Sequence, residues 1–377
     1  MKIAFASDAS YPWFKGGIEK RRYLIIKELV AKGHDVHVFT MRSPGMPSRD
    51  FEYEGATYHC CGTAPSTYAM YSKGRRDIPK PISYAAIVFF RMLGSRFEII
   101  DADSFPFLHI PLLWLYAKLT RAKFVVTWHE VWDAKYWRQY LGTVKGTIGY
   151  AVEKLCAAVS SNMIANSEST RDRLVSVFGK KANEIPILPA AISAAEIDAY
   201  LSRSRSHSAR KQKQFIMVGR LIKEKRFDMG ISAINDVNAN LAIVGVGDQK
   251  AKLVSLARAK ARGKVSFTEN LARYDLFDRI SGSAALLMLS AREGLSLITL
   301  EALSLGTPVL IVKSTSLPGN IRRFCIEVDD SKLGQAMRDI IALPKRYAAG
   351  AARSRGIVMN AFSTRRSVAI YKKIRER

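Results

Sequence analysis

Residues 2–40, "KIAFASDASYPWFKGGIEKRRYLIIKELVAKGHDVHVFT", decide the fold of the chain. They begin with an apolar run over residues 2–7, which predicts a buried strand, and continue into a loop rich in proline and glycine. A helical pattern follows over residues 18–33, and residues 35–40 predict a second strand. The apolar face of this helix carries Ile18, Ile25, Ile26, Leu29 and Val30. A strand, a helix and a strand in this order predict two parallel strands joined by a right-handed crossover.

The same alternation continues along the rest of the chain. Strand patterns occur at residues 97–103, 123–130 and 161–168, and from residue 214 five strand patterns alternate with four helical ones. A Ser/Arg/Lys-rich stretch with almost no apolar content, 203–214, separates the two halves. We therefore expect an α/β protein with two Rossmann-like, doubly wound parallel-sheet domains. The expected boundaries are 1–190 for the first domain, 191–213 for a linker region and 214–355 for the second domain.

The charge of the chain is strongly positive. Its 377 residues contain 59 lysines and arginines against 33 acids, a formal net charge of +26. Such a field attracts polyanions, which include nucleic acid, an anionic membrane surface and phosphorylated ligands. General solubility is the plainer explanation. The run at 203–214 also admits RNA binding, although the chain has no recognisable nucleic-acid motif.

The sequence predicts neither a leader peptide nor a membrane-spanning segment. A strand pattern starts at the first residues, and no apolar run reaches the roughly 20 residues of a transmembrane helix. The four cysteines show no metal-ligand spacing and predict buried thiols in a reducing compartment. We expect a cytoplasmic protein, either soluble or peripherally associated with a membrane. Residues 71–93 place a basic loop before an apolar, aromatic helix, which fits contact with an anionic membrane or burial against the sheet equally well.

Ligands of open parallel sheets bind beyond the carboxyl ends of the strands, so the residues there are candidates for a site. In the second domain Arg220 follows a strand and Lys225 lies five residues further on, so both cations could bind one phosphate. A solvated loop is the alternative. The motif "VGVGD" (244–248) lacks the third glycine of a dinucleotide-binding fingerprint and predicts a tight turn.

The stretch "SAREGLSLITLEALSLGTPVL" (290–310) follows another predicted strand. A helix is expected to begin near Leu295, and a helix N-terminus attracts phosphate. Its free amides would belong to Leu295, Ser296 and Leu297. Glu293 stands beside this helix start, where a carboxylate can accept hydrogen bonds from sugar hydroxyls, and Glu301 lies within the helix. The alternatives are a charge that favours the helix start for Glu293 and a surface glutamate for Glu301.

Further candidates lie in the first domain. Gly16 and Gly17 open a helix, so their amides could approach an anion without an obstructing Cβ atom. His129 ends a strand, where a structural and a catalytic role are equally open. The aspartates of "DAD" (101–103) resemble a metal-binding signature, but their position favours a turn at the end of a strand.

Together these motifs resemble the retaining glycosyltransferases of family GT4, which have the GT-B architecture of two Rossmann-like domains with an interdomain cleft. The resemblance runs through nearly the whole chain, and its most specific part is a Glu-x7-Glu element that follows a Gly-Arg-Leu…Lys element. The matching segments are "KGGIEK" (15–20), "VVTWHE" (125–130), "ANSEST" (165–170), "VGRLIKEK" (218–225), "VGVGD" (244–248) and residues 290–310.

The resemblance implies a role for each candidate residue. Arg220 and Lys225 would bind the diphosphate of a nucleotide diphospho-sugar, with help from the amides around Ser296 and Leu297. Glu293 would bind the donor sugar and Glu301 the ribose. The other donor contacts would come from Gly16, Gly17, Phe267, Leu271 and Leu295, and His129 would face the transferred sugar.

The implied reaction is a hexosyl transfer with retention to a glycan or a lipid-linked acceptor, with neither a metal nor another cofactor and no nucleic acid as partner. Its catalytic residues would be His129, Glu293, Arg220 and Lys225. The last helix, 356–377, would pack back on the first domain. Rival functions are a phosphorylase or epimerase of the same architecture, a basic polyanion-binding protein and an inactive homologue. The chain departs from the family pattern at "LPAAI" (188–192) and at Leu295–Ser296, beside the implied donor sugar.

Overall fold

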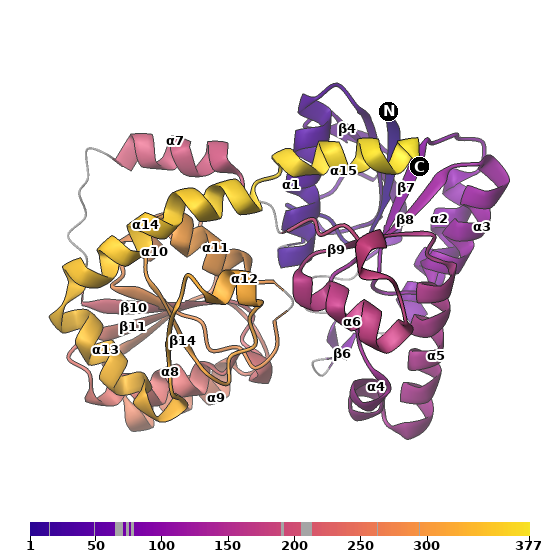
Figure 1. Cartoon of the computed structure of the whole chain (residues 1–377). Coiled ribbons are helices and arrows are strands. Elements are labelled where there is room, and N and C mark those ends of the chain that lie inside the picture. The colour runs from indigo at the N-terminus through magenta and orange to yellow at the C-terminus, as the bar shows by residue number, and fades with distance from the viewer. Residues whose placement is uncertain are drawn as a thin grey trace. The chain divides into compact units, whose positions relative to one another are not determined.

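The chain divides into two compact units (Figure 1). The computed structural model describes all residues except 15, 49, 65–70, 73–74, 77–78, 190–191, 205–212, 262 and 294, and the side chains of 71–72, 75–76, 79–81, 204 and 365. Unit 1 comprises Met1–Ala191 together with Thr364–Arg377, and unit 2 comprises Ile192–Ser363. The C-terminal end of the chain therefore belongs to the first unit.

Unit 1 contains a seven-stranded sheet in the order β3-β4-β2-β1-β7-β8-β9. Neighbouring strands are parallel except β3 and β4, which are antiparallel. The strands are β1 (Lys2–Ala6), β2 (Asp35–Arg42), β3 (Phe51–Tyr53), β4 (Ala56–Thr63), β7 (Ile99–Asp103), β8 (Lys123–Trp128) and β9 (Asn162–Ala165), and β5 (Tyr71–Ser72) pairs separately with β6 (Arg75–Arg76). The winding reverses between β1 and β7, which is where doubly wound sheets bind ligands.

Helices cover both faces of this sheet (Figure 1). One face holds α1 (Gly17–Ala31) and the C-terminal α15 (Arg365–Glu376). The other holds α2 (Pro79–Met92), α3 (His109–Thr120) and α5 (Thr143–Val159), and the remaining helices of the unit are α4 (Ala134–Leu141) and α6 (Glu168–Phe178). Neighbouring strand residues point to opposite faces, so Phe5 contacts the first layer and Ala4 and Ala6 the second.

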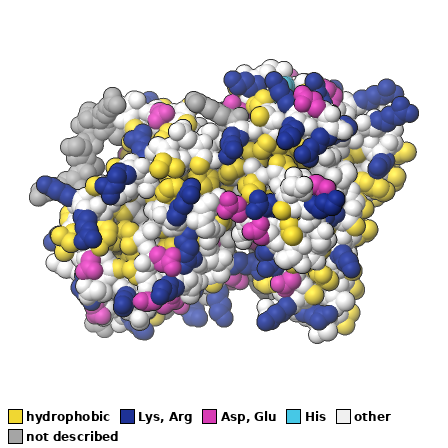
Figure 2. Space-filling model, viewed as in Figure 1, with side chains coloured by type: hydrophobic (Ala, Val, Ile, Leu, Met, Phe, Trp, Pro, Cys, Tyr) yellow, Lys and Arg dark blue, Asp and Glu magenta, His cyan; other side chains and the backbone are white. Residues whose placement is uncertain are grey.

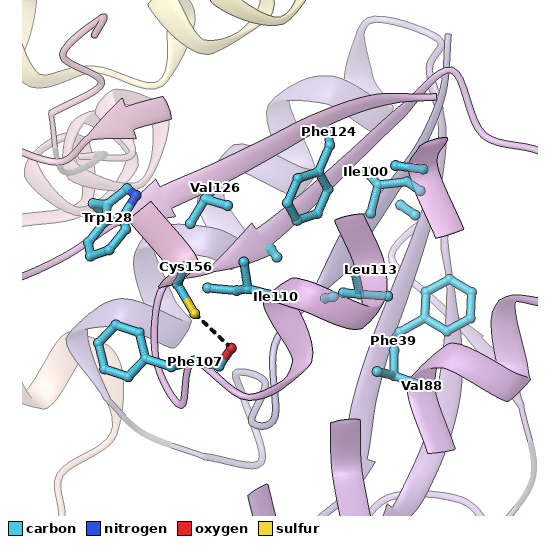
Figure 3. Close-up of a cluster of buried hydrophobic side chains, with 14 of the residues drawn as sticks. Phe39, Val88, Ile100, Phe107, Ile110, Leu113, Phe124, Val126, Trp128 and Cys156 are labelled. Carbon is cyan, nitrogen blue, oxygen red and sulfur yellow. Dashed lines mark hydrogen bonds between the residues drawn. The ribbon is translucent and has the colours of Figure 1, made fainter. Parts of the chain in front are cut away.

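The larger apolar layer of unit 1 lies between the sheet and α2, α3 and α5 (Figure 3). Ile100 and Phe124 come from neighbouring strands, and Val88 and Leu113 come from the helices that cover them. The Cys156 thiol of α5 donates a hydrogen bond to the carbonyl oxygen of Phe107 at 3.3 Å. Strands buried on both faces are apolar almost throughout, which explains the continuous apolar runs of the sequence.

Unit 2 contains a six-stranded sheet in the order β12-β11-β10-β13-β14-β15, with all neighbours parallel. Its strands are β10 (Gln214–Val218), β11 (Asn240–Val244), β12 (Val265–Thr268), β13 (Ala285–Leu287), β14 (Val309–Val312) and β15 (Ile326–Val328). Its helices are α7 (Ala194–Ser204), α8 (Phe227–Ala233), α9 (Lys250–Lys260), α10 (Arg273–Gly282), α11 (Leu297–Ser304), α12 (Gly319–Arg322), α13 (Leu333–Ala342) and α14 (Pro344–Phe362). The winding reverses between β10 and β13.

The architecture confirms the predicted fold class of two Rossmann-like parallel-sheet domains. Two details differ from the sequence-based expectations. The expected linker region contains helix α7, and much of the stretch 203–214 and part of 188–192 lie outside the described residues. The expected last helix consists of two helices, α14 and α15, which are separated by the extended backbone of Ser363, and only α15 belongs to unit 1. Among the described helices, none is both long enough and apolar enough to cross a bilayer.

The turn "VGVGD" brings two loops of unit 2 into backbone contact. A Cβ atom on Gly245 would lie 1.9 Å from the carbonyl oxygen of Gly219, and one on Gly247 would lie 2.4 Å from that of Leu221. The Leu221 amide donates to the Val246 carbonyl oxygen at 2.8 Å. The glycines therefore let the loops after β10 and β11 pack together, which agrees with a tight turn.

Replacement of Gly245 by alanine should destabilise unit 2. The new methyl group would meet Gly219, and the φ of 151° is one that only glycine adopts readily; such backbone strain costs about 1–3 kcal/mol. Thermal unfolding followed by circular dichroism should show a lower midpoint. The matched control is Gly350→Ala in α14, where nothing lies within 4 Å of the added Cβ atom. Equal melting of Gly245→Ala and the unchanged protein would contradict this close approach.

Candidate functional site

In unit 2, Lys225 and Glu293 form an ion pair, although they follow different strands. Lys225 ends a 3-10 turn (Lys223–Lys225) after β10, and Glu293 lies in the loop between β13 and α11. Both side chains are mostly buried, and the Ala291 amide donates to the Glu224 carbonyl oxygen at 2.8 Å beside them. Since β10 and β13 flank the reversal of winding, this pair lies where a ligand is expected.

Arg220 lies in the same loop as Lys225, two residues after β10. Its side chain is exposed. The backbone of its loop is held in place by the contacts of Gly219 and Leu221 with the glycine turn 244–248. Arg220 and Lys225 therefore lie on one short loop whose backbone is held on its inner side.

Arg226 holds three loops of this edge together, and the sequence analysis missed it. Its Nε donates to the carbonyl oxygen of Leu289 at 2.5 Å, and its Nη1 and Nη2 donate to the hydroxyl and carbonyl oxygens of Ser314 at 2.7 and 3.0 Å. It thus ties the loop after β10 to those after β13 and β14. Its position next to the motif lysine was visible in the sequence, but nothing there distinguished its role from that of Lys225.

Helix α11 begins at Leu297, two residues later than expected. Ser296 is its N-cap: its buried hydroxyl accepts a hydrogen bond from the Thr299 amide at 3.4 Å. The amides of Leu295 and Ser296 therefore precede the helix, and the expectation that they form its first turn is wrong. This bond uses the amide of the third helical residue, Thr299. The amides of Leu297 and Ile298 are the first two of the helix and point out of its N-terminal end.

Glu301 is buried within α11 and is bound by Arg273, which contradicts the surface-glutamate alternative. The Arg273 Nη2 atom donates to the Glu301 carboxylate at 2.7 Å. The same guanidinium donates to both oxygens of Glu196 in α7 at 3.0 Å. Arg273 therefore fixes the orientation of Glu301, a role that no sequence pattern indicated because the two residues come from different helices.

The other candidates of unit 2 lie further from this cluster along the sheet. Phe267 belongs to β12, at the edge of the sheet beyond β11, and packs partly against the apolar core. Leu271 is half-buried between β12 and α10. Neither residue shares a hydrogen bond or ion pair with the cluster around Lys225 in the described part of the chain, and their contact with the donor stays a prediction.

In unit 1, His129 is fixed by Asp103 within a buried network of charges. The His129 Nε2 atom lies 2.7 Å from the Asp103 carboxylate, and Arg22 of α1 forms ion pairs with both Asp103 and Asp101. The Asp101 carboxylate also accepts hydrogen bonds from Thr127, at 2.9 Å, and from Tyr371 of α15. "DAD" therefore lies within β7 as ion-pair partners, and the predicted turn there is wrong.

The protonation states follow from this network. Burial lowers the pKa of His129 below 6.5, and it outweighs the opposing effect of Asp103. Burial alone would raise the pKa of Asp103, but Arg22 and His129 hold it well below its usual range. A neutral imidazole beside an ionised carboxylate carries its proton on the facing nitrogen, so Nε2 donates to Asp103 and Nδ1 is the acceptor nitrogen.

Gly16 and Gly17 form the start of α1, as expected, with Gly16 as its N-cap. Glu19, in the first turn, lies against this start: a Cβ atom on Gly16 would come within 1.9 Å of its carboxylate. An anion that approached these amides would meet this negative charge. Among the residues that the structure describes, no three His, Cys, Asp or Glu side chains are grouped to hold a metal ion.

Comparison with known proteins agrees with this architecture. Residues 15–196 match the model of Glycosyltransferase Family 4, and residues 201–348 match that of Glycosyl transferases group 1. The chain belongs to family 4 of the glycosyltransferases. It is a nucleotide-sugar glycosyltransferase of the GT-B architecture.

Three proteins show how far the likeness to known sequences and structures extends. The chain is 25% identical to a glycogen synthase of Mycobacterium tuberculosis over 370 residues, 91% of this chain and 87% of that one. A sucrose-phosphate synthase of Thermosynechococcus elongatus has a TM-score of 0.80 at 17% identity, covering 100% of this chain and 98% of the other. The Anabaena protein HepE in complex with UDP-glucose has a TM-score of 0.71 at 15% identity, with coverage of 100% and 98%.

His129 should be more than half neutral at pH 6.5, because burial holds its folded-state pKa below that value. The unfolded chain then binds a proton that the folded chain does not, so stability falls as the pH drops below 6.5, by up to about 1.4 kcal/mol per pH unit from this group. Histidine-ring NMR measures the titration, and denaturation at several pH values measures the slope. His129→Gln assigns the signal and removes its part of the slope. A ring that titrates at or above pH 6.5 would contradict the assignment.

Proposed function

We propose that the chain transfers a hexose from a nucleotide diphospho-sugar to a hydroxyl of a glycan or lipid-linked acceptor, with retention at the anomeric carbon and without a metal. The observation that carries the proposal is the contact of Lys225 with Glu293 beside the start of α11. It brings a cation suited to a phosphate next to a carboxylate suited to sugar hydroxyls. A diphospho-sugar presents both groups to such a pair.

The diphosphate would bind to Arg220, Lys225 and the amides at the start of α11. Departure of the nucleoside diphosphate places negative charge on its terminal phosphate, and donors that are already in place stabilise this charge most in the transition state. The loop contacts of Gly219 and Leu221 and the bonds of Arg226 keep the backbone of this edge in place. In the proposal these cations and amides supply the charge that a metal ion supplies elsewhere.

Retention would follow from attack on the face from which the diphosphate departs. The anomeric carbon becomes oxocarbenium-like, the acceptor oxygen bonds to it, and a leaving phosphate oxygen takes the acceptor proton. Glu293 is bonded to Lys225, so we assign it to sugar hydroxyls rather than to nucleophilic attack. Glu301, oriented by Arg273, would accept hydrogen bonds from the ribose.

His129 would act on the transferred sugar as a hydrogen-bond acceptor. Its Nε2 proton is committed to Asp103, so the neutral ring offers the lone pair of Nδ1. A sugar hydroxyl is a suitable donor for it. Asp103 is then a positioning residue, because it sets the tautomer of His129.

Nucleotide binding tests the donor site. Isothermal calorimetry with UDP, GDP and ADP should find one that binds, and UDP is the first choice because the similar protein HepE was solved with UDP-glucose. Arg220→Ala and Lys225→Ala should each weaken binding about 10- to 100-fold, since a charge-assisted hydrogen bond contributes about 1.5–3 kcal/mol. Lys223→Ala, exposed on the same turn, is the matched control. Failure of all three nucleotides to bind, or an equal loss in the control, would sink the assignment.

Slow donor hydrolysis tests the chemistry without knowledge of the acceptor. With the nucleotide-glucose that binds, and with EDTA present, the released glucose should keep the anomeric configuration of the donor. Arg220→Ala should lower this rate by roughly 10²–10³-fold, as expected for loss of one preorganised donor. His129→Asn should lower the rate but leave nucleotide binding unchanged. Inverted product, a requirement for added divalent cation, or sugar 1-phosphate formed from glycan and phosphate would each contradict the proposal.

A further inference from the structure

The exposed large apolar side chains of the protein are concentrated on one side of unit 1. Eight of the eleven among the described residues lie on α2, α3 and α5 or directly after α2. They are Ile82, Phe90, Leu93, Leu115, Leu119, Val144, Ile148 and Leu155. The other three, Ile18, Leu343 and Ile357, are scattered over α1 and unit 2. We call the surface formed by the eight residues the apolar face.

The spacing of these residues makes a stripe on each helix. Val144, Ile148 and Leu155 recur at intervals of four and seven along α5, and Leu115 and Leu119 are four apart on α3, so the members of each set share one side of their helix. The opposite sides carry buried residues such as Cys156 and Leu113, which pack on the sheet (Figure 3). Each helix thus buries one apolar side and exposes another.

The three stripes lie beside one another. α3 packs against both α2 and α5 on the same face of the sheet (Figure 1). Phe90 and Leu119 are 67% and 70% exposed, and Val144 and Ile148 are 74% and 60% exposed. Apolar side chains that are this exposed on adjacent helices form a contiguous apolar patch, and such patches usually mark interaction sites.

Among the described side chains of these three helices every exposed charge is basic, and Arg91 of α2 is paired with Asp50. The sequences of α2 and α3 contain no acid, and the single acid of α5, Glu153, is buried, where it accepts hydrogen bonds from the Trp132 amide and the Trp137 indole at 2.7 and 2.6 Å. Lys118, Lys145 and Lys154 are exposed beside the stripes, and within the described part of the chain no carboxylate pairs with them. Figure 2 shows hydrophobic and basic side chains side by side where Figure 1 places these helices.

We infer that the apolar face of α2, α3 and α5 docks on the surface of an anionic lipid bilayer. Apolar side chains between exposed lysines match both parts of such a surface, its acyl boundary and its anionic headgroups. A second copy of the chain would bring the same basic residues and a formal charge of +26 against one another. The sequence left membrane contact and burial against the sheet open for residues 71–93. In α2, one side of the helix is buried against the sheet and the other side is exposed.

Vesicle flotation tests the inference and needs neither donor nor acceptor. The full chain should float with vesicles of phosphatidylcholine and phosphatidylglycerol at low salt and should not float with phosphatidylcholine alone. The combined variant Phe90→Ser/Leu119→Ser/Ile148→Ser should reduce the bound fraction about tenfold or more. Lys118→Gln/Lys145→Gln/Lys154→Gln should weaken binding and its dependence on salt. The melting temperature and nucleotide binding should stay unchanged, because all six side chains are exposed and outside the site.

Leu343→Ser/Ile357→Ser is the matched control, since both residues are exposed apolar side chains of unit 2. Absence of binding to the anionic vesicles overturns the inference, as does equal binding by the triple serine variant or an equal loss in the control. A dimer in analytical ultracentrifugation that the serine variant dissociates, without vesicle binding, would assign the apolar face to a second copy instead.

Discussion

Parallel pairing of the strands is the constraint on which both units depend. It brings the carboxyl ends of the strands to one edge of each sheet, so side chains that are distant in sequence meet there. In unit 2 this edge joins Lys225 and Glu293 across 68 positions of sequence, and in unit 1 it joins Asp103 and His129 across 26. The connections between strands then decide only which loops carry these residues.

The two edges use charge differently. In unit 1 Arg22 is buried between Asp101 and Asp103, and removal of such ions from water costs several kcal/mol each unless each charge is paired and hydrogen-bonded. The hydroxyls of Thr127 and Tyr371 complete the shell of Asp101. In unit 2 the charges of Lys225 and Arg220 lie nearer the surface, where they can exchange partners with a ligand. The buried network of unit 1 therefore fixes the positions of its side chains, whereas Lys225 and Arg220 of unit 2 are suited to binding a ligand.

The sequence could predict what depends on local pattern. Apolar runs and helical periodicity gave both sheets, and the position of residues after strands gave Lys225 and Glu293 as neighbours of one site. Arg273 and Asp103 escaped prediction because their roles depend on partners in other elements, Glu301 and His129. The start of α11 was predicted two residues too early because Ser296 caps the helix instead of belonging to it. The sequence alone does not show whether a serine at such a position is the cap or the first helical residue.

Helix α15 gives unit 1 an unusual dependence on the end of the chain. The rings of Tyr371 and Phe5 of the central strand make a T-shaped contact with 5.7 Å between their centroids. The Tyr371 hydroxyl donates a hydrogen bond to Asp101. In the sequence, all of unit 2 lies between the two segments of unit 1, Met1–Ala191 and Thr364–Arg377. During synthesis, unit 2 is therefore complete as a continuous segment before the ribosome releases the helix that finishes unit 1. Unit 1 is thus translated first for most of its length, but the helix that completes its packing is made only after the whole of unit 2.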